Sequence, residues 1–310
     1  MIEGYKILEK IGEGYSSIIY KAENILLNRV VALKVLKKMD QSSIARFKRE
    51  AKILAKLNHP NIVAIYSISL EGTYKFIEME YVSGKTLKNI IEDDDVRLGD
   101  LLGIFQEALE AIKYIHSLGV VHRDIKPDNI LINTKDRLIK IVDLGLSHEG
   151  KYHDLTQSNH MLGTPFYLPP ESFNGVNAVT DKSDVYSLGL TFFTLLANKG
   201  RPFDRVENIG QLYYNVMHIK NQVRRELSYK YPNEIIDLIE RMVEADPLKR
   251  YNATDASLRV TQIRNKYGDR KLNEFSFKEY MLNLMSWRSI VGFLMLLLYA
   301  LYELFQHIGK

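Results

Sequence analysis

The chain has 310 residues and a formal net charge of +4, with 46% hydrophobic and 26% charged residues and no cysteine. This composition is typical of a globular protein, and the charge is too small to indicate nucleic-acid binding. The lack of cysteine excludes disulfides, thiolate metal sites and a cysteine nucleophile. Residues 1–6 lack a basic segment followed by an apolar run, so we expect no signal peptide and favour a cytoplasmic location.

Residues 5–39 contain short apolar runs separated by glycine and polar pairs, which predicts an antiparallel sheet. Gly12 and Gly14 lie within it, and their spacing would let a turn approach a phosphate chain with its backbone N–H groups facing the anion. A glycine pair in a hairpin is more often an ordinary turn, so both interpretations stay open at this point.

Lys34 lies in an apolar strand predicted over residues 30–36, and a helix is predicted over residues 44–57. An isolated lysine of this kind would ordinarily be an edge-strand charge. The apolar residues of the helix recur at helical spacing, at Ile44, Phe47, Ala51, Leu54 and Ala55. Glu50 lies among them and supplies a carboxylate that could pair with Lys34.

Two further strands are predicted at 62–66 and 74–82, and a helix over 101–118 ends before Gly119. The acidic run at 92–95 is interpreted as a solvated loop or helix end without a function.

Residues 121–131 read VHRDIKPDNIL, with polar and charged groups enclosed by apolar residues. Such a segment is typical of a loop held rigid for chemistry, and the alternative is a polar turn between two strands. A strand predicted over 137–142 then ends in Asp143, followed by Leu144 and Gly145. A carboxylate at a strand end before glycine is well placed to bind a metal ion.

These motifs, in this order, resemble those of the eukaryotic-type (Hanks-type) serine/threonine protein kinase family over residues 5–265. The shared patterns are the glycine-rich loop, the V-A-L-K strand, H-R-D-x-K-x-x-N, D-L-G and P-P-E. The sequence departs from the family pattern at Ser17, Ile19, Leu144 and Pro169. The resemblance implies an α+β, two-lobed fold with an N-lobe over 1–82, a C-lobe over 83–265 and a tail over 266–310.

The resemblance also implies ATP and Mg²⁺ as cofactors. Asp124 would orient the attacking hydroxyl, Lys126 would lie near the transferred phosphoryl group, and Lys34, paired with Glu50, would bind phosphates. Asn129 and Asp143 would hold magnesium. Met79 would guard the back pocket, and the backbone of residues 80–82 would bind the adenine edge. The full set expected to bind the nucleotide is Ile11, Gly12, Glu13, Gly14, Ser17, Ile19, Ala32, Lys34, Met79, Glu80, Val82 and Leu131.

Residues 163–171 resemble the end of a kinase activation segment, and Thr164 together with Lys126 indicates Ser or Thr as acceptor. Arg123 favours a loop ordered by phosphate, so autophosphorylation is expected at Thr156 or Ser158; the alternative is a flexible polar loop.

Two carboxylates are expected to be structural. The resemblance implies that Glu171 pairs with Arg250 and that Asp184 accepts hydrogen bonds from the backbone of the catalytic loop.

Residues 289–302 form an uncharged apolar segment in the tail. A helix that is apolar on all sides must be buried in a bilayer, in the chain's own large lobe or in a partner. Basic residues upstream favour a membrane, with the kinase on its cytoplasmic face. They are Arg259, Arg264, Lys266, Arg270 and Lys271.

The expected function is transfer of the γ-phosphoryl group of ATP to Ser or Thr of a protein substrate. A pseudokinase scaffold that binds nucleotide without turnover is the first alternative, favoured only by Ser17 and Leu144. A small-molecule phosphotransferase is disfavoured by Lys126 and residues 163–171, and a membrane adaptor acting through its tail leaves the catalytic loop unexplained.

Overall fold

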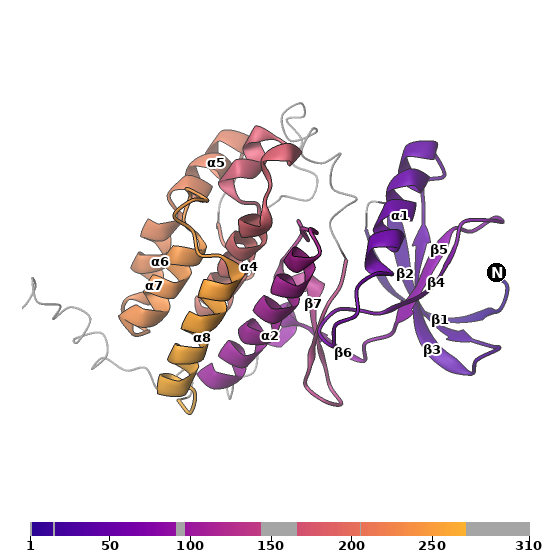
Figure 1. Cartoon of the computed structure of the whole chain (residues 1–310), viewed down its shortest axis with the longest axis horizontal. Helices are drawn as coiled ribbons and strands as arrows, with labels where there is room; N and C mark the ends of the chain where they lie inside the picture. The colour runs from indigo at the N-terminus through magenta and orange to yellow at the C-terminus, as the bar shows by residue number, and fades with distance from the viewer. Residues whose placement is uncertain (1, 15, 91–96, 144–165, 205, 271–310) are drawn as a thin grey trace, which may run out of the picture.

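The structure is a computed structural model that describes residues 2–14, 16–90, 97–143, 166–204 and 206–270. Most of the strands lie in the first half of the chain and most of the helices in the second half. Figure 1 shows β1–β5 and α1 at one end of the molecule, the larger helices at the other, and a small sheet between them. This is the two-lobed α+β arrangement that the sequence predicts.

The first lobe is built on five antiparallel strands in the order β1-β2-β3-β5-β4. They are β1 (Tyr5–Glu13), β2 (Ser17–Asn24), β3 (Arg29–Leu36), β4 (Ile65–Ser69) and β5 (Phe76–Glu80). Strands β3 and β5 each have a neighbouring strand on both sides, and they are the most buried, from Val31 to Leu36 and from Phe76 to Met79. Lys34 therefore lies inside the sheet, opposite Ile77, and not at its edge.

Helix α1 (Gln41–Leu54) packs on this sheet, with Phe47 and Ala51 against Leu36 and Ile77. The prediction of 44–57 was displaced by three residues at each end. The helix begins earlier because Asp40 is its N-cap and accepts the backbone N–H of Ser43 at 2.9 Å.

The strand prediction at 62–66 was wrong for its first half, because β4 begins only at Ile65. Ile62 instead forms a parallel bridge with Ile141, and the Val63 N–H donates to the Ile141 carbonyl at 3.0 Å. This apolar run therefore joins the two lobes through backbone hydrogen bonds. The second predicted strand, 74–82, is shortened to β5.

A small three-stranded sheet lies between the lobes, in the order β6-β7-β8. Its strands are β6 (Gly84–Thr86), β7 (Ile130–Asn133) and β8 (Ile139–Ile141). Two 3-10 turns, Leu87–Ile90 and Pro127–Asn129, flank it. Strand β8 is shorter than the predicted 137–142 because Arg137 has a φ of 60° and belongs to the turn.

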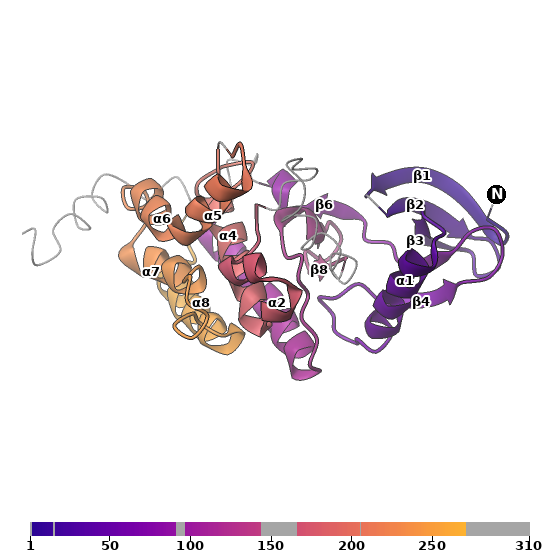
Figure 2. The same cartoon turned by 90° about the horizontal axis from the view of Figure 1, so that it is seen from above.

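The helical lobe packs around α4, in which every residue from Ser183 to Leu196 is buried. Its helices are α2 (Leu98–Ser117), α4 (Asp181–Leu196), α5 (Ile209–Met217), α6 (Ile219–Leu227), α7 (Asn233–Met242) and α8 (Ala253–Tyr267). Two short 3-10 helices, Pro170–Asn174 and Val176–Ala178, precede α4. Phe105 of α2 and Phe192 of α4 have ring centroids 4.2 Å apart. Figure 2 shows α4 inside this lobe, with α2 on the side toward the first lobe and α6 on the far side.

The start of α2 is joined directly to the end of α8. The Leu98 N–H donates to the Arg270 carbonyl at 2.9 Å, and the Gly99 N–H donates to the Gly268 carbonyl at 3.0 Å. A Cβ at Gly99 would lie 2.4 Å from that Gly268 oxygen, so the close approach requires glycine.

None of the helices in the described residues is long and apolar enough to cross a membrane. The apolar segment 289–302 lies outside those residues.

Glu171 and Arg250 form the ion pair that was predicted. The guanidinium donates to both carboxylate oxygens, at 2.7 and 2.9 Å, and the Ser183 hydroxyl donates to Glu171 Oε1 at 2.6 Å. Both side chains are buried. The pair ties the segment before α4 to the loop before α8.

Arg250→Met should therefore lower the free energy of unfolding by about 3–5 kcal/mol, because it leaves the Glu171 carboxylate buried without its partner. Urea denaturation measures this, with Arg225→Met as a control on an exposed arginine. A loss no larger than that of the control would show that the pair contributes little.

Candidate nucleotide and phosphoryl-transfer site

Asp184 of α4 fixes the backbone of the loop that contains Asp124. The carboxylate of Asp184 accepts the backbone N–H groups of His122 and Arg123, each at 2.8 Å. The ring Nε2 of His116, on α2, donates to the same carboxylate at 2.8 Å. The predicted contact between Asp184 and the loop backbone is confirmed, whereas the contact from His116 was missed.

The backbone at Arg123 is left-handed, with a φ of 70°. A non-glycine residue in this region costs about 1–3 kcal/mol and persists only where its surroundings fix it. The two hydrogen bonds from Asp184 fix it here. The unusual backbone sets the direction in which the next residue, Asp124, leaves the loop.

The polar side chains of the loop converge on Asp124. Lys126 Nζ donates to Asp124 Oδ2 at 2.7 Å, and Asn129 Nδ2 donates to the same oxygen and to the Asp124 carbonyl, both at 2.8 Å. The amide nitrogen of Asn129 is thus committed to Asp124. The amide oxygen is the atom of Asn129 that could bind a cation.

His122 joins this loop to the strand end before Asp143, a role that the sequence reasoning missed. Its Nδ1 accepts the Asp124 N–H at 3.3 Å, and its Nε2 lies 3.2 Å from the Val142 carbonyl. These partners assign a neutral ring with the proton on Nε2. Burial lowers the pKa of His122 below its ordinary value.

Lys34 brings three separate elements together. Its Nζ donates to Glu50 Oε1 on α1 at 2.5 Å and to Asp143 Oδ1 beyond β8 at 2.7 Å. Burial by itself would lower the pKa of Lys34, but the charges of Asp143 and Glu50 outweigh it and raise the pKa. The ion pair expected between Lys34 and Glu50 is present, and it extends to Asp143.

The β1–β2 hairpin has room beside its glycines. The Gly14 N–H closes the turn on the Ser17 carbonyl at 2.9 Å, and Lys37 Nζ donates to Glu13 Oε1 at 2.5 Å. A Cβ at Gly12 or Gly14 would meet no atom closer than 3.7 Å, so the folded protein itself does not require glycine there. A ligand that approaches the backbone would require it.

An apolar cluster includes near neighbours in the chain of Lys34 and Asp143. Ala32, Val63 and Met79 are buried together, and Ile19, Ile65, Tyr81 and Val142 pack against them. Val63 and Val142 were not among the residues predicted to bind nucleotide, although Val142 immediately precedes Asp143. Of the other predicted residues, Val82 is buried, Leu131 is half-buried on β7, and Ile11 is exposed.

The oxygen donors available to a metal fit magnesium. Asn129 and Asp143 supply an amide and a carboxylate oxygen, and Mg²⁺ in such sites takes its remaining ligands from substrate phosphates and water. Within the described ranges, no group of three or more His, Asp or Glu side chains could hold a metal ion. Leu144, Gly145, Thr156, Ser158 and Thr164 lie outside the described residues.

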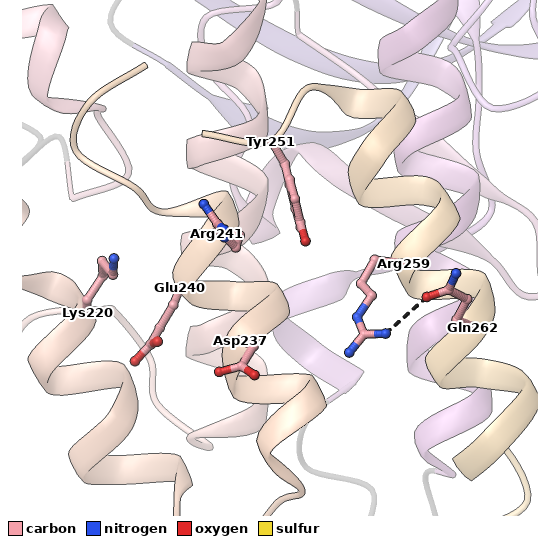
Figure 3. A pocket seen from close by; sticks show the side chains of 7 residues that line it. All are labelled: Lys220, Asp237, Glu240, Arg241, Tyr251, Arg259 and Gln262. Atoms are coloured by element: carbon pink, nitrogen blue, oxygen red, sulfur yellow. Dashed lines mark hydrogen bonds between the residues drawn. The ribbon is translucent and has the colours of Figure 1, made fainter. Parts of the chain in front are cut away.

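A separate polar pocket of about 560 Å³ lies among α6, α7 and α8 (Figure 3). Its lining residues are Lys220, Asp237, Glu240, Arg241, Tyr251, Arg259 and Gln262. Its carboxylates face Arg224, whose Nη2 lies 2.7 Å from Glu240 and 3.4 Å from Asp237. None of the predicted site residues lines this pocket.

A buried lysine between two carboxylates, a glycine hairpin and a loop in which lysine and asparagine converge on an aspartate are groups that can bind and polarise the phosphates of a nucleotide. A family model of the protein kinase domain matches residues 5–259. The chain therefore belongs to the protein kinase family.

Bacterial proteins are among its relatives. The chain is 35% identical to the serine/threonine-protein kinase PrkC of Bacillus subtilis over 88% of its own length. It is 40% identical to a probable serine/threonine-protein kinase PknB of Lactococcus lactis over 84%, and 35% identical to a probable serine/threonine-protein kinase of Clostridium acetobutylicum over 85%. The matches cover 42%, 41% and 40% of those three proteins, so the chain spans less than half of their length.

Acid should destabilise the protein through His122. The pKa of His122 is lower in the folded than in the unfolded chain. As the pH falls below about 6.5, the unfolded chain therefore binds a proton at this histidine before the folded chain does. The contribution of neutral His122 to the free energy of unfolding is complete above that pH. Between the unfolded and the folded pKa of His122, it should fall by about 1.4 kcal/mol for each pH unit of acidification.

Urea denaturation between pH 5 and 7.5 measures this slope, which should be smaller in His122→Gln than in wild type. Acidic residues with lowered pKa values, such as Glu171, add to the slope in both proteins, so the difference between them is the relevant quantity. His218→Gln, at an exposed histidine, is the control. Equal slopes in wild type and His122→Gln would contradict the assignment.

Proposed function

We propose that this chain is an ATP- and Mg²⁺-dependent protein kinase that phosphorylates Ser or Thr side chains. The observation that carries the proposal is the convergence of Lys126 and Asn129 on Asp124, beside the Lys34–Asp143 contact. Its membership in the protein kinase family and its similarity to bacterial serine/threonine-protein kinases support it.

In this proposal, Asp124 orients the acceptor hydroxyl and takes its proton as the oxygen–phosphorus bond forms. The bond between the γ-phosphorus and the β–γ bridging oxygen breaks, and ADP leaves. Lys126 and Lys34 offset the phosphate charge. The magnesium held by Asn129 and Asp143 would neutralise charge on the phosphates. Positioning and electrostatics account for most of the catalysis in such a reaction.

The nucleotide would lie between the two sheets. The hairpin at Gly12 and Gly14 would cover its phosphates, and the apolar cluster of Ala32 and Met79 would contact its base. Glu80 and Val82 would offer backbone groups to the adenine edge, with Leu131 on the opposite side.

Asp124→Asn should lower kcat by about 10²- to 10⁴-fold, because the amide cannot accept the proton. Transfer of labelled phosphate from ATP with Mg²⁺ measures this, and Asp136→Asn on the exposed β7–β8 turn is the control. The variant should still bind nucleotide. Mapping the label in wild type also tests Thr156 and Ser158, which we propose as autophosphorylation sites.

A wild-type chain that binds nucleotide but transfers no label would instead establish the pseudokinase alternative. Label on Thr156 or Ser158 that is equally strong in Asp124→Asn would contradict the catalytic role of Asp124.

We also propose that the segment 289–302 contacts a membrane and keeps the kinase on its cytoplasmic face. The uncharged apolar sequence and the basic residues upstream support this proposal. The full chain should float with vesicles that contain anionic lipid, and Leu297→Asp should weaken flotation. Flotation unchanged by this substitution would favour burial of the segment in the protein or a partner.

A further inference from the structure

An ion pair connects the two sheets beside the proposed adenine site. Lys140, in the middle of β8, donates from Nζ to Oε2 of Glu80, the last residue of β5, at 2.8 Å. The two side chains are only 14% and 23% exposed. The proposed reaction uses the backbone of Glu80 and assigns no role to its carboxylate or to Lys140.

Glu80 is also held by Ala64, the residue that precedes β4. The Glu80 N–H donates to the Ala64 carbonyl at 2.9 Å, and the Ala64 N–H lies 3.3 Å from Glu80 Oε2. The backbone of Glu80 is thereby fixed at the point where it would meet the adenine edge.

Lys140 is placed equally firmly in β8. It pairs with Leu131 across the β7–β8 ladder, and Leu131 is the residue proposed on the other side of the nucleotide. The next residue, Ile141, accepts the Val63 N–H at 3.0 Å and donates to the Asn61 carbonyl at 2.8 Å. Asp143 follows two residues later.

We propose that Lys140 is a positioning residue for the nucleotide. Through Glu80 it fixes the distance between the strand that offers the adenine contacts and the strand that leads to Asp143. This inference rests on the proposed function, since it concerns the same nucleotide. A partly buried ion pair has a stronger electrostatic interaction than an exposed pair, because water screens its charges less.

Lys140→Met and Glu80→Gln should each raise the Kd for ADP about fivefold, and the double variant should bind no more weakly than either single one. Equilibrium binding with a fluorescent ADP analogue measures this. Lys135→Met, at an exposed lysine in the same β7–β8 hairpin, is the matched control. In turnover by Lys140→Met, the effect should appear in KM for ATP, with kcat at saturating ATP changed by less than about twofold.

Lys140→Arg keeps the charge and should bind ADP within about twofold of wild type. If Lys140→Met fails to fold, the comparison of Glu80→Gln with Lys140→Arg decides, and equal Kd values for these two would overturn the proposal. A Kd for Lys140→Met equal to that of Lys135→Met, or additive effects in the double variant, would also overturn it. Wild type that binds ADP without phosphate transfer would contradict the proposed function and leave this comparison valid.

Discussion

The loop that contains Asp124 depends on the carboxylate of Asp184 for its shape. This carboxylate lies at the start of a helix whose later turns are wholly buried, so its position is set by the core of the large lobe. From there it accepts two backbone N–H groups of the loop and the ring of His116. A loop with a left-handed arginine and several charges has no stable shape of its own. It takes its shape from the rigid element beneath it.

The second constraint is electrostatic. Lys34 is buried in the central strand of a sheet, where an uncompensated ammonium group would be costly. Glu50 and Asp143 compensate it, and they arrive from a helix and from the end of another strand. The charge balance of this group of three therefore requires β3, α1 and the strand end after β8 to meet. The same three elements form part of the proposed nucleotide site, so the contacts that neutralise Lys34 also help to assemble that site.

The sequence predicted the contacts better than the boundaries of the elements. Lys34–Glu50, Glu171–Arg250 and the Asp184 contact were all expected, because each is carried by a motif that implies both partners. The extents of α1 and β4 were misplaced for different reasons. Asp40 caps the helix before its first apolar residue, and Ile62 pairs with a strand nearly eighty residues away. His116 gave no signal, and His122 begins the H-R-D motif but was assigned no role, since the Asp184 carboxylate and the Val142 carbonyl are brought close to these rings only by the fold.

The junction between α2 and α8 has a mechanical consequence. Two backbone hydrogen bonds fasten the first turn of α2 to Gly268 and Arg270, and the backbones there approach so closely that a Cβ at Gly99 would clash. A pull on the chain beyond residue 270 would therefore be borne by the first turn of α2. The last turn of the same helix carries His116. Because a helix is stiff along its axis, α2 connects Arg270 mechanically to the residues that support the loop around Asp124.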